Sequence, residues 1–176
     1  DAQDASARQA TLTRILIRIS REALQGASLD SMMQGICGCL VAELPVAIVS
    51  VLLLNDDNSE FVHEVYAGEF TQSPLAASGR WPVTVGAAGR CVRLGRPHLI
   101  RDIATDPDYV PGNATARSEY LVPIRHGRRL HGVLNLESVP DESGLRAAPG
   151  AVTIKQIERQ VADRAFELDL VRPRLT

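Results

Sequence analysis

Residues 46–54 form a nearly continuous aliphatic run, Val-Ala-Ile-Val-Ser-Val-Leu-Leu-Leu, and no other feature constrains the fold as much. A short, unbroken run of this kind predicts a central β-strand that is covered on both faces. The residues before it follow a different period. Between Leu29 and Leu44, apolar side chains recur at i, i+3, i+4 and i+7, which predicts a helix that Pro45 ends. The chain therefore needs a sheet with a layer on either side.

Two hairpins define that sheet. Residues 55–58, Asn-Asp-Asp-Asn, form a turn, and residues 61–67 can return as a second strand. A second hairpin joins residues 118–125 to residues 129–138. Hairpins connect antiparallel neighbours, so the sequence predicts an α+β fold with an antiparallel sheet and helices on one face.

Shorter elements complete the pattern. An apolar stripe predicts a first helix that ends at Gly26, and a short helix is expected to begin at Gly86 and end near Gly95. Short strands are predicted over residues 80–85 and 99–103. Residues 152–171 predict a last helix with a heptad-like apolar stripe made of Ile154, Ile157, Val161, Leu168 and Val171.

Composition excludes several function classes. The formal net charge is −2, and no basic region of the kind that binds nucleic acid is present, so we expect no nucleic-acid partner. No apolar run reaches the ~18 residues of a membrane span, so no membrane partner is expected. The chain has three cysteines, an odd and sparse number that favours a reducing compartment, and we expect a cytoplasmic location.

Several segments, taken in order, resemble those of GAF domains. The first is residues 83–92, Val-Thr-Val-Gly-Ala-Ala-Gly-Arg-Cys-Val, and the second is residues 97–102, Pro-His-Leu-Ile-Arg-Asp. Residues 106–109, 118–124 and 132–138 continue the resemblance. It implies a six-stranded antiparallel sheet with the N-terminal helices and the C-terminal helix on one face. On the other face, loops between Trp81 and Arg117 would enclose a small-molecule cavity.

The resemblance also implies a role. Residues 1–27 would be an N-terminal signalling helix, and residues 28–172 would be the GAF domain with its C-terminal helix. We expect a sensory or regulatory module of a bacterial-type signalling protein, dimeric through its terminal helices and covalently linked to an output domain. No cofactor is evident, and the ligand would be an unidentified small molecule. The candidate ligand-binding residues are Trp81, Cys91, Asp102, Tyr109, Ser118, Glu119, Tyr120, Asn135 and Glu137.

Three of these candidates also fit purely structural roles. Cys91 can be a small buried core residue, Asp102 can cap the loop that follows its strand, and Trp81 can be a core residue. No group of histidines and carboxylates has the spacing of a metal site, so we predict none.

Subtypes of the family differ in chemistry. The chain lacks the Asn-Lys…Phe-x-x-x-Asp-Glu pattern of the cyclic-nucleotide binders, and residues 106–117 hold no cysteine for covalent bilin attachment. Free methionine sulfoxide reductases are more similar: Cys91 lies close to their first cysteine, and Glu119 and Glu137 match the acidic positions that hold the substrate amine. Their second cysteine, expected within residues 106–117, is missing. We therefore predict that this chain is not an enzyme. A reductase-like enzyme and a purely structural dimerisation module remain the alternatives.

Overall fold

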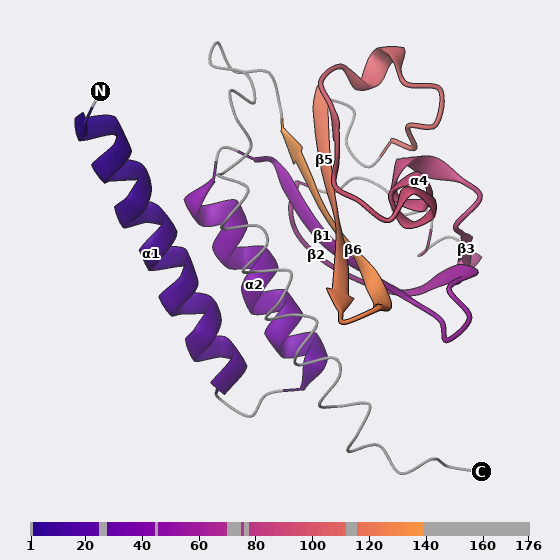
Figure 1. The fold of residues 1–176 in the computed structure, drawn as a ribbon, viewed down its shortest axis with the longest axis horizontal. Helices are drawn as coiled ribbons and strands as arrows, with labels where there is room; N and C mark the ends of the chain where they lie inside the picture. The colour runs from indigo at the N-terminus through magenta and orange to yellow at the C-terminus, as the bar shows by residue number, and fades with distance from the viewer. Residues whose placement is uncertain are drawn as a thin grey trace.

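The computed structural model describes residues 2–24, 28–44, 46–69, 75, 78–111 and 116–138. Six antiparallel strands form one sheet in the order β3-β2-β1-β6-β5-β4 (Figure 1). The strands are β1 (Ile48–Leu54), β2 (Glu60–Gly68), β3 (Trp81–Pro82), β4 (His98–Ile100), β5 (Ser118–His126) and β6 (Arg129–Ser138). The predicted α+β fold and its six-stranded antiparallel sheet are confirmed. The aliphatic run forms the inner strand β1, which pairs with β2 on one side and β6 on the other.

Two helices, α1 (Ala2–Leu24) and α2 (Leu29–Glu43), lie on one side of the sheet (Figure 1). The Ser28 hydroxyl caps α2 by accepting a hydrogen bond from the Ser31 amide, and this satisfies an amide that would otherwise lack a partner. One face of α2 packs on the sheet, and α1 contacts α2. Because α2 is covered from two sides, Cys39 is buried although it lies off the main apolar stripe.

On the opposite side of the sheet lie α4 (Gly86–Leu94) and the short 3₁₀ helix η1 (Ile103–Thr105) (Figure 1). Helix α4 contacts β5 and β6. A second apolar cluster fills this layer, and it includes Leu52, Phe61, Trp81, Ala88, Cys91, Leu121 and Val133. The sheet therefore separates two cores. We call the one on the side of α1 and α2 the helix-face core and the one on the side of α4 the α4-face core.

Strand β5 contains a proline, which cannot donate to a sheet ladder. Pro123 pairs with Val133 of β6, whereas β4 stops at the His98–Leu121 pair, before Pro123 is reached. The short β4 therefore leaves this part of β5 at an edge, where proline is tolerated.

Two sequence predictions concern residues beyond those described. The helix expected at residues 152–171 lies outside them, so the domain limits of 1–27 and 28–172 stay predictions. Within the described ranges, no helix combines the length and the hydropathy that a membrane span requires.

Candidate functional site

Two glutamates face each other on the α4 side of the sheet. Glu119 of β5 and Glu137 of β6 are a directly opposed pair in the β5–β6 register, and both are almost completely buried. Asn135 precedes Glu137 by two residues and therefore lies on the same face. Its Nδ2 donates to Glu137 Oε1 at 3.2 Å. Strand pairing thus gathers three polar side chains into one buried cluster, which we call the acidic cluster.

The acidic cluster has more acceptors than donors. Glu119 Oε2 and Asn135 Oδ1 are buried, and neither has a hydrogen-bond partner among the described residues. A buried polar atom without a partner is costly, and native proteins seldom tolerate one without a reason. With two such acceptors beside a second carboxylate, the cluster has more acceptors than its described N–H and O–H donors satisfy.

Burial also changes the protonation of these groups. It raises the pKa of Glu119 well above its usual range, and the nearby carboxylate of Glu137 adds to the effect. Burial likewise raises the pKa of Glu137, although hydrogen bonds from Tyr109 and Asn135 oppose the change. Either a proton or a cation held between the two carboxylates would relieve their repulsion.

A loop closes over the acidic cluster. The Tyr109 hydroxyl donates to Glu137 Oε2 at 3.2 Å. Arg90 of α4 ties the same loop in place, since one of its Nη atoms bonds Asp106 and the other reaches Asp108 Oδ2 at 3.0 Å. This ion pairing is partly buried, and Arg90 holds the pKa of Asp106 below its usual range. None of these three charged residues was among the predicted site residues, because β4 and a turn separate Arg90 from its partners in the chain.

Three apolar predicted residues lie on the same face of the sheet as the acidic cluster. Trp81 and Cys91 belong to the α4-face core, and Tyr109 packs against it. The Trp81 indole donates to the Val85 carbonyl at 3.2 Å and meets Phe61 edge-on, with ring centroids 5.6 Å apart. Cys91 is fully buried, and its thiol donates to the Arg96 carbonyl at 3.5 Å.

Three predicted residues lie apart from this group. Side chains alternate along a strand, so Ser118 and Tyr120 point to the opposite face from Glu119. Tyr120 packs against the helix-face core, and the hydroxyl of Ser118 bonds that of Ser138. Asp102 is exposed and caps η1, accepting from the Ala104 amide at 3.1 Å. Ligand contact by any of the nine residues stays a prediction.

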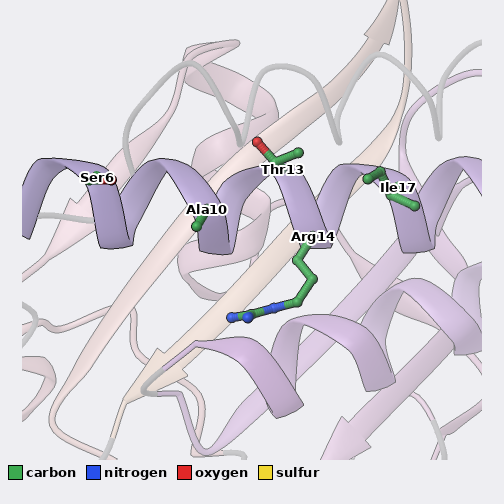
Figure 2. A pocket seen from close by; sticks show the side chains of 5 residues that line it. All are labelled: Ser6, Ala10, Thr13, Arg14 and Ile17. Carbon is green, nitrogen blue, oxygen red and sulfur yellow. The ribbon is translucent and has the colours of Figure 1, made fainter.

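Two grooves lie elsewhere on the described surface. One follows the outer side of α1 and is lined by Ser6, Ala10, Thr13, Arg14 and Ile17 (Figure 2). The other runs between the start of α2 and β2 and is lined by Asp30, Ser31, Gln34, His63, Glu64, Val65 and Tyr66. Neither reaches the acidic cluster. No group of three or more potential metal ligands occurs within the described part of the chain.

Comparison with known proteins gives a family match and many similar folds. The model of the GAF domain family matches residues 26–148. No curated protein matches the sequence. The GAF domain of a phosphoenolpyruvate-protein phosphotransferase from Coxiella burnetii superposes with a TM-score of 0.77 at 17% identity, over 92% of this chain and 96% of that one.

Enzymes share this fold as well. Free methionine-R-sulfoxide reductase from Neisseria meningitidis, solved with its substrate, gives a TM-score of 0.75 at 18% identity, over 96% of this chain and 94% of that one. A type II free methionine-R-sulfoxide reductase from Thermoplasma acidophilum gives 0.65 at 18% identity, over 79% and 93%. The missing second cysteine led us to predict that this chain is not an enzyme. That prediction was wrong, because several proteins with the same fold are enzymes. Whether this chain is an enzyme is open.

Proposed function

The chain belongs to the GAF domain family, and from this membership we propose that it is a sensory module whose α4 face binds a small molecule with a cationic nitrogen. The observation that carries the proposal is the acidic cluster. Glu119 and Glu137 are buried side by side, and Glu119 Oε2 and Asn135 Oδ1 receive no hydrogen bond from the residues that the structure describes.

Charge favours a cation over other ligands. Among the described residues, Arg90 is a cation near the cluster, and it is already bonded to Asp106 and Asp108. A protonated amine supplies three N–H donors and one positive charge, and so it satisfies these acceptors and reduces carboxylate repulsion together. An anionic ligand would bring further negative charge to a buried site that already holds two carboxyl groups and is disfavoured.

The surroundings suggest the rest of the ligand. Leu121 follows Glu119 by two residues and Val133 precedes Asn135 by two, so both lie beside the acidic cluster on the same face, and Leu52 pairs with Val133. An apolar site with a few fixed polar groups is the usual design of a small-molecule pocket. We therefore propose a short amine with an apolar or weakly polar arm.

Calorimetric titration tests this proposal, with n-butylammonium and methionine-R-sulfoxide as the two probes. Glu119→Gln and Glu137→Gln each remove a group that can ionise against a bound cation, and each is expected to weaken binding at least ~10-fold, because a charge-assisted bond is lost. Glu60→Gln is the matched control, since Glu60 pairs with Arg80 at the surface. Binding that is absent for both probes, or that is equally strong in all variants, would contradict the proposal.

A second candidate function is reduction of a free sulfoxide, and one observation favours it: Cys91 lies in the same apolar cluster that borders the acidic pair. Attack of a thiol on the sulfoxide sulfur would transfer oxygen, giving the thioether and a sulfenic acid on Cys91. A second thiol would then form a disulfide and release water. Cys37 and Cys39 both lie in the helix-face core, across the sheet, so an external thiol would have to serve. Turnover of methionine-R-sulfoxide with thioredoxin, lost in Cys91→Ser, would establish this activity.

For signal relay we propose pairing through the terminal helices. Ser6, Ala10, Thr13 and Ile17 line one side of α1 at alternating four- and three-residue spacing, which is the pattern of a helix pair. Arg14 lines the same groove, and Figure 2 shows its side chain on the side of the helix opposite Thr13 and Ile17; it bonds Glu43 of α2. Ile17 is 55% exposed. Ile17→Glu is expected to give monomers in sedimentation analysis, whereas dimers that persist would refute pairing at this face.

A further inference from the structure

The Tyr109 hydroxyl takes a place in the acidic cluster that a ligand donor would otherwise fill. It donates to Glu137 Oε2, while Asn135 Nδ2 donates to Oε1, so both oxygens of Glu137 are engaged. By contrast, Glu119 Oε2 has no described partner. Glu137 therefore has hydrogen-bond partners for both oxygens, whereas Glu119 does not. One of the two partners of Glu137 comes from a loop and not from the sheet.

The loop that carries Tyr109 is fastened to α4. Arg90 holds Asp106 and Asp108 with separate nitrogens, and Asp106 Oδ1 accepts from the Asp108 amide at 2.9 Å. The Tyr109 amide donates to the Asp106 carbonyl. One guanidinium thus fixes a tight turn directly before the tyrosine. Arg90 also leaves its own Nε buried without a described partner, so the clamp is not fully satisfied.

The same loop lies close to the single tryptophan of the chain, since Val110 packs against the apolar cluster that includes Trp81. A methyl group added at Gly86 would meet both Val110 and Trp81, so these two side chains converge over the start of α4. Movement of residues 106–110 would therefore change the surroundings of Trp81. The indole serves as a built-in optical reporter for this loop.

We propose that Tyr109 is a displaceable internal occupant of the acidic cluster and sets its selectivity, with Arg90 as the residue that positions it. The inference rests on the proposed function. A ligand must offer Glu137 a better donor than a neutral phenol, and a protonated amine does so because its bond to the carboxylate is charge-assisted. Neutral alcohols and amides offer no such advantage. Competition with the Tyr109 hydroxyl therefore excludes neutral alcohols and amides. It also couples binding of a ligand to the position of the loop that carries Tyr109.

The test is titration of the full chain and two variants with n-butylammonium at pH 7.5, followed by calorimetry and by Trp81 emission. Tyr109→Phe keeps the ring and removes the competing hydroxyl, so affinity is expected to rise about 10-fold. Arg90→Lys keeps the charge but loses the two-pronged clamp, and it is expected to raise affinity roughly threefold, since it loosens the loop. Tyr66→Phe, at a tyrosine on β2, is the control and should match the wild type.

The outcomes separate the two proposals. Wild-type binding with a shift in Trp81 emission, and tighter binding by Tyr109→Phe, supports the inference. Wild-type binding that Tyr109→Phe leaves equal or weaker overturns the competition while the proposed function stands. Absence of binding in the wild type and in both variants overturns the proposed function, and the inference with it. As a readout without ligand, faster hydrogen exchange at residues 106–110 is expected in Tyr109→Phe, and unchanged exchange would count against the role of the hydroxyl.

Discussion

Gly86 is the residue at which backbone and side-chain constraints meet beside the site. Its φ is +80°, and a Cβ built there would lie 2.9 Å from Trp81 Cζ2 and 3.3 Å from Val110 Cγ2. Gly86→Ala therefore carries two penalties, one for the left-handed backbone and one for the contact. Gly127→Ala separates them, because Gly127 has φ +58° and no described atom within 4 Å of its added methyl group.

The two penalties have known sizes. A left-handed conformation costs an ordinary residue about 1–2 kcal/mol, partly offset because alanine restricts the unfolded chain more than glycine does. Overpacking in a filled core costs a further 1–3 kcal/mol, roughly. We expect Gly127→Ala to lower the free energy of unfolding by about 1 kcal/mol and Gly86→Ala by about 3 kcal/mol. For a chain of this length, this corresponds to roughly 2–4 °C and 6–12 °C in Tm.

Thermal unfolding followed by circular dichroism measures both variants, and Trp81 emission of the folded protein reports whether the indole has moved. The Gly86→Ala/Trp81→Phe double variant adds a check, because phenylalanine lacks the Cζ2 atom in the contact. Its destabilisation should be at least ~1 kcal/mol less than the sum of the two single changes. Equal destabilisation by Gly86→Ala and Gly127→Ala, or strict additivity in the double variant, would refute the packing penalty.

Three further predictions concern charges. Burial raises the pKa of Glu119, so its favourable contribution to the free energy of unfolding is present below the pKa of the unfolded state and is lost as pH rises through the pKa of the folded state. Glu119→Gln should therefore stabilise the protein at pH 8 but hardly at pH 4, as measured by urea unfolding. Arg90→Ala leaves Asp106 without its cation and should cost about 1–2 kcal/mol at pH 7. Because the pKa of Asp106 is lowered, that difference should shrink as acid protonates the carboxyl. Asp56→Asn breaks the ion pair between Arg129 and this fully exposed carboxylate and should leave the urea midpoint unchanged.

Most of the fold follows from local patterns in the sequence. The helical stripe from residue 29, the aliphatic run and both hairpins appear in the structure within a few residues of their predicted limits. The short β3 was expected over residues 80–85 but has only two, Trp81 and Pro82, because proline and a turn end the pairing. Helices and strands with a clear hydrophobic period, and hairpins with clear turn residues, can therefore be predicted from the sequence. The limits of a short edge strand depend instead on the strands beside it.

The candidate site was less predictable, for two physical reasons. First, side chains alternate along a strand, so Ser118 and Tyr120 must point to the opposite face from Glu119. Applying this rule to the sequence would have removed both from the list of candidate site residues. Second, no sequence pattern indicated the ion pairs of Arg90, since Asp106 and Asp108 lie in a loop that only the tertiary fold brings to α4. The donor from Tyr109 to Glu137 joins distant segments in the same way.

The place of β1 inside the sheet has a consequence for how the chain is made. Its first neighbour, β2, follows at once, but Val51 also pairs with Leu134 of β6, which is synthesised much later. At ribosomal rates of 5–20 residues per second, the second edge of β1 waits roughly 4–17 s for its partner. During that interval an aliphatic strand with open backbone groups is a template for pairing with other chains. A nascent or truncated chain that stops before Arg129 is therefore expected to aggregate through β1, and chaperone demand should peak just before β6 emerges.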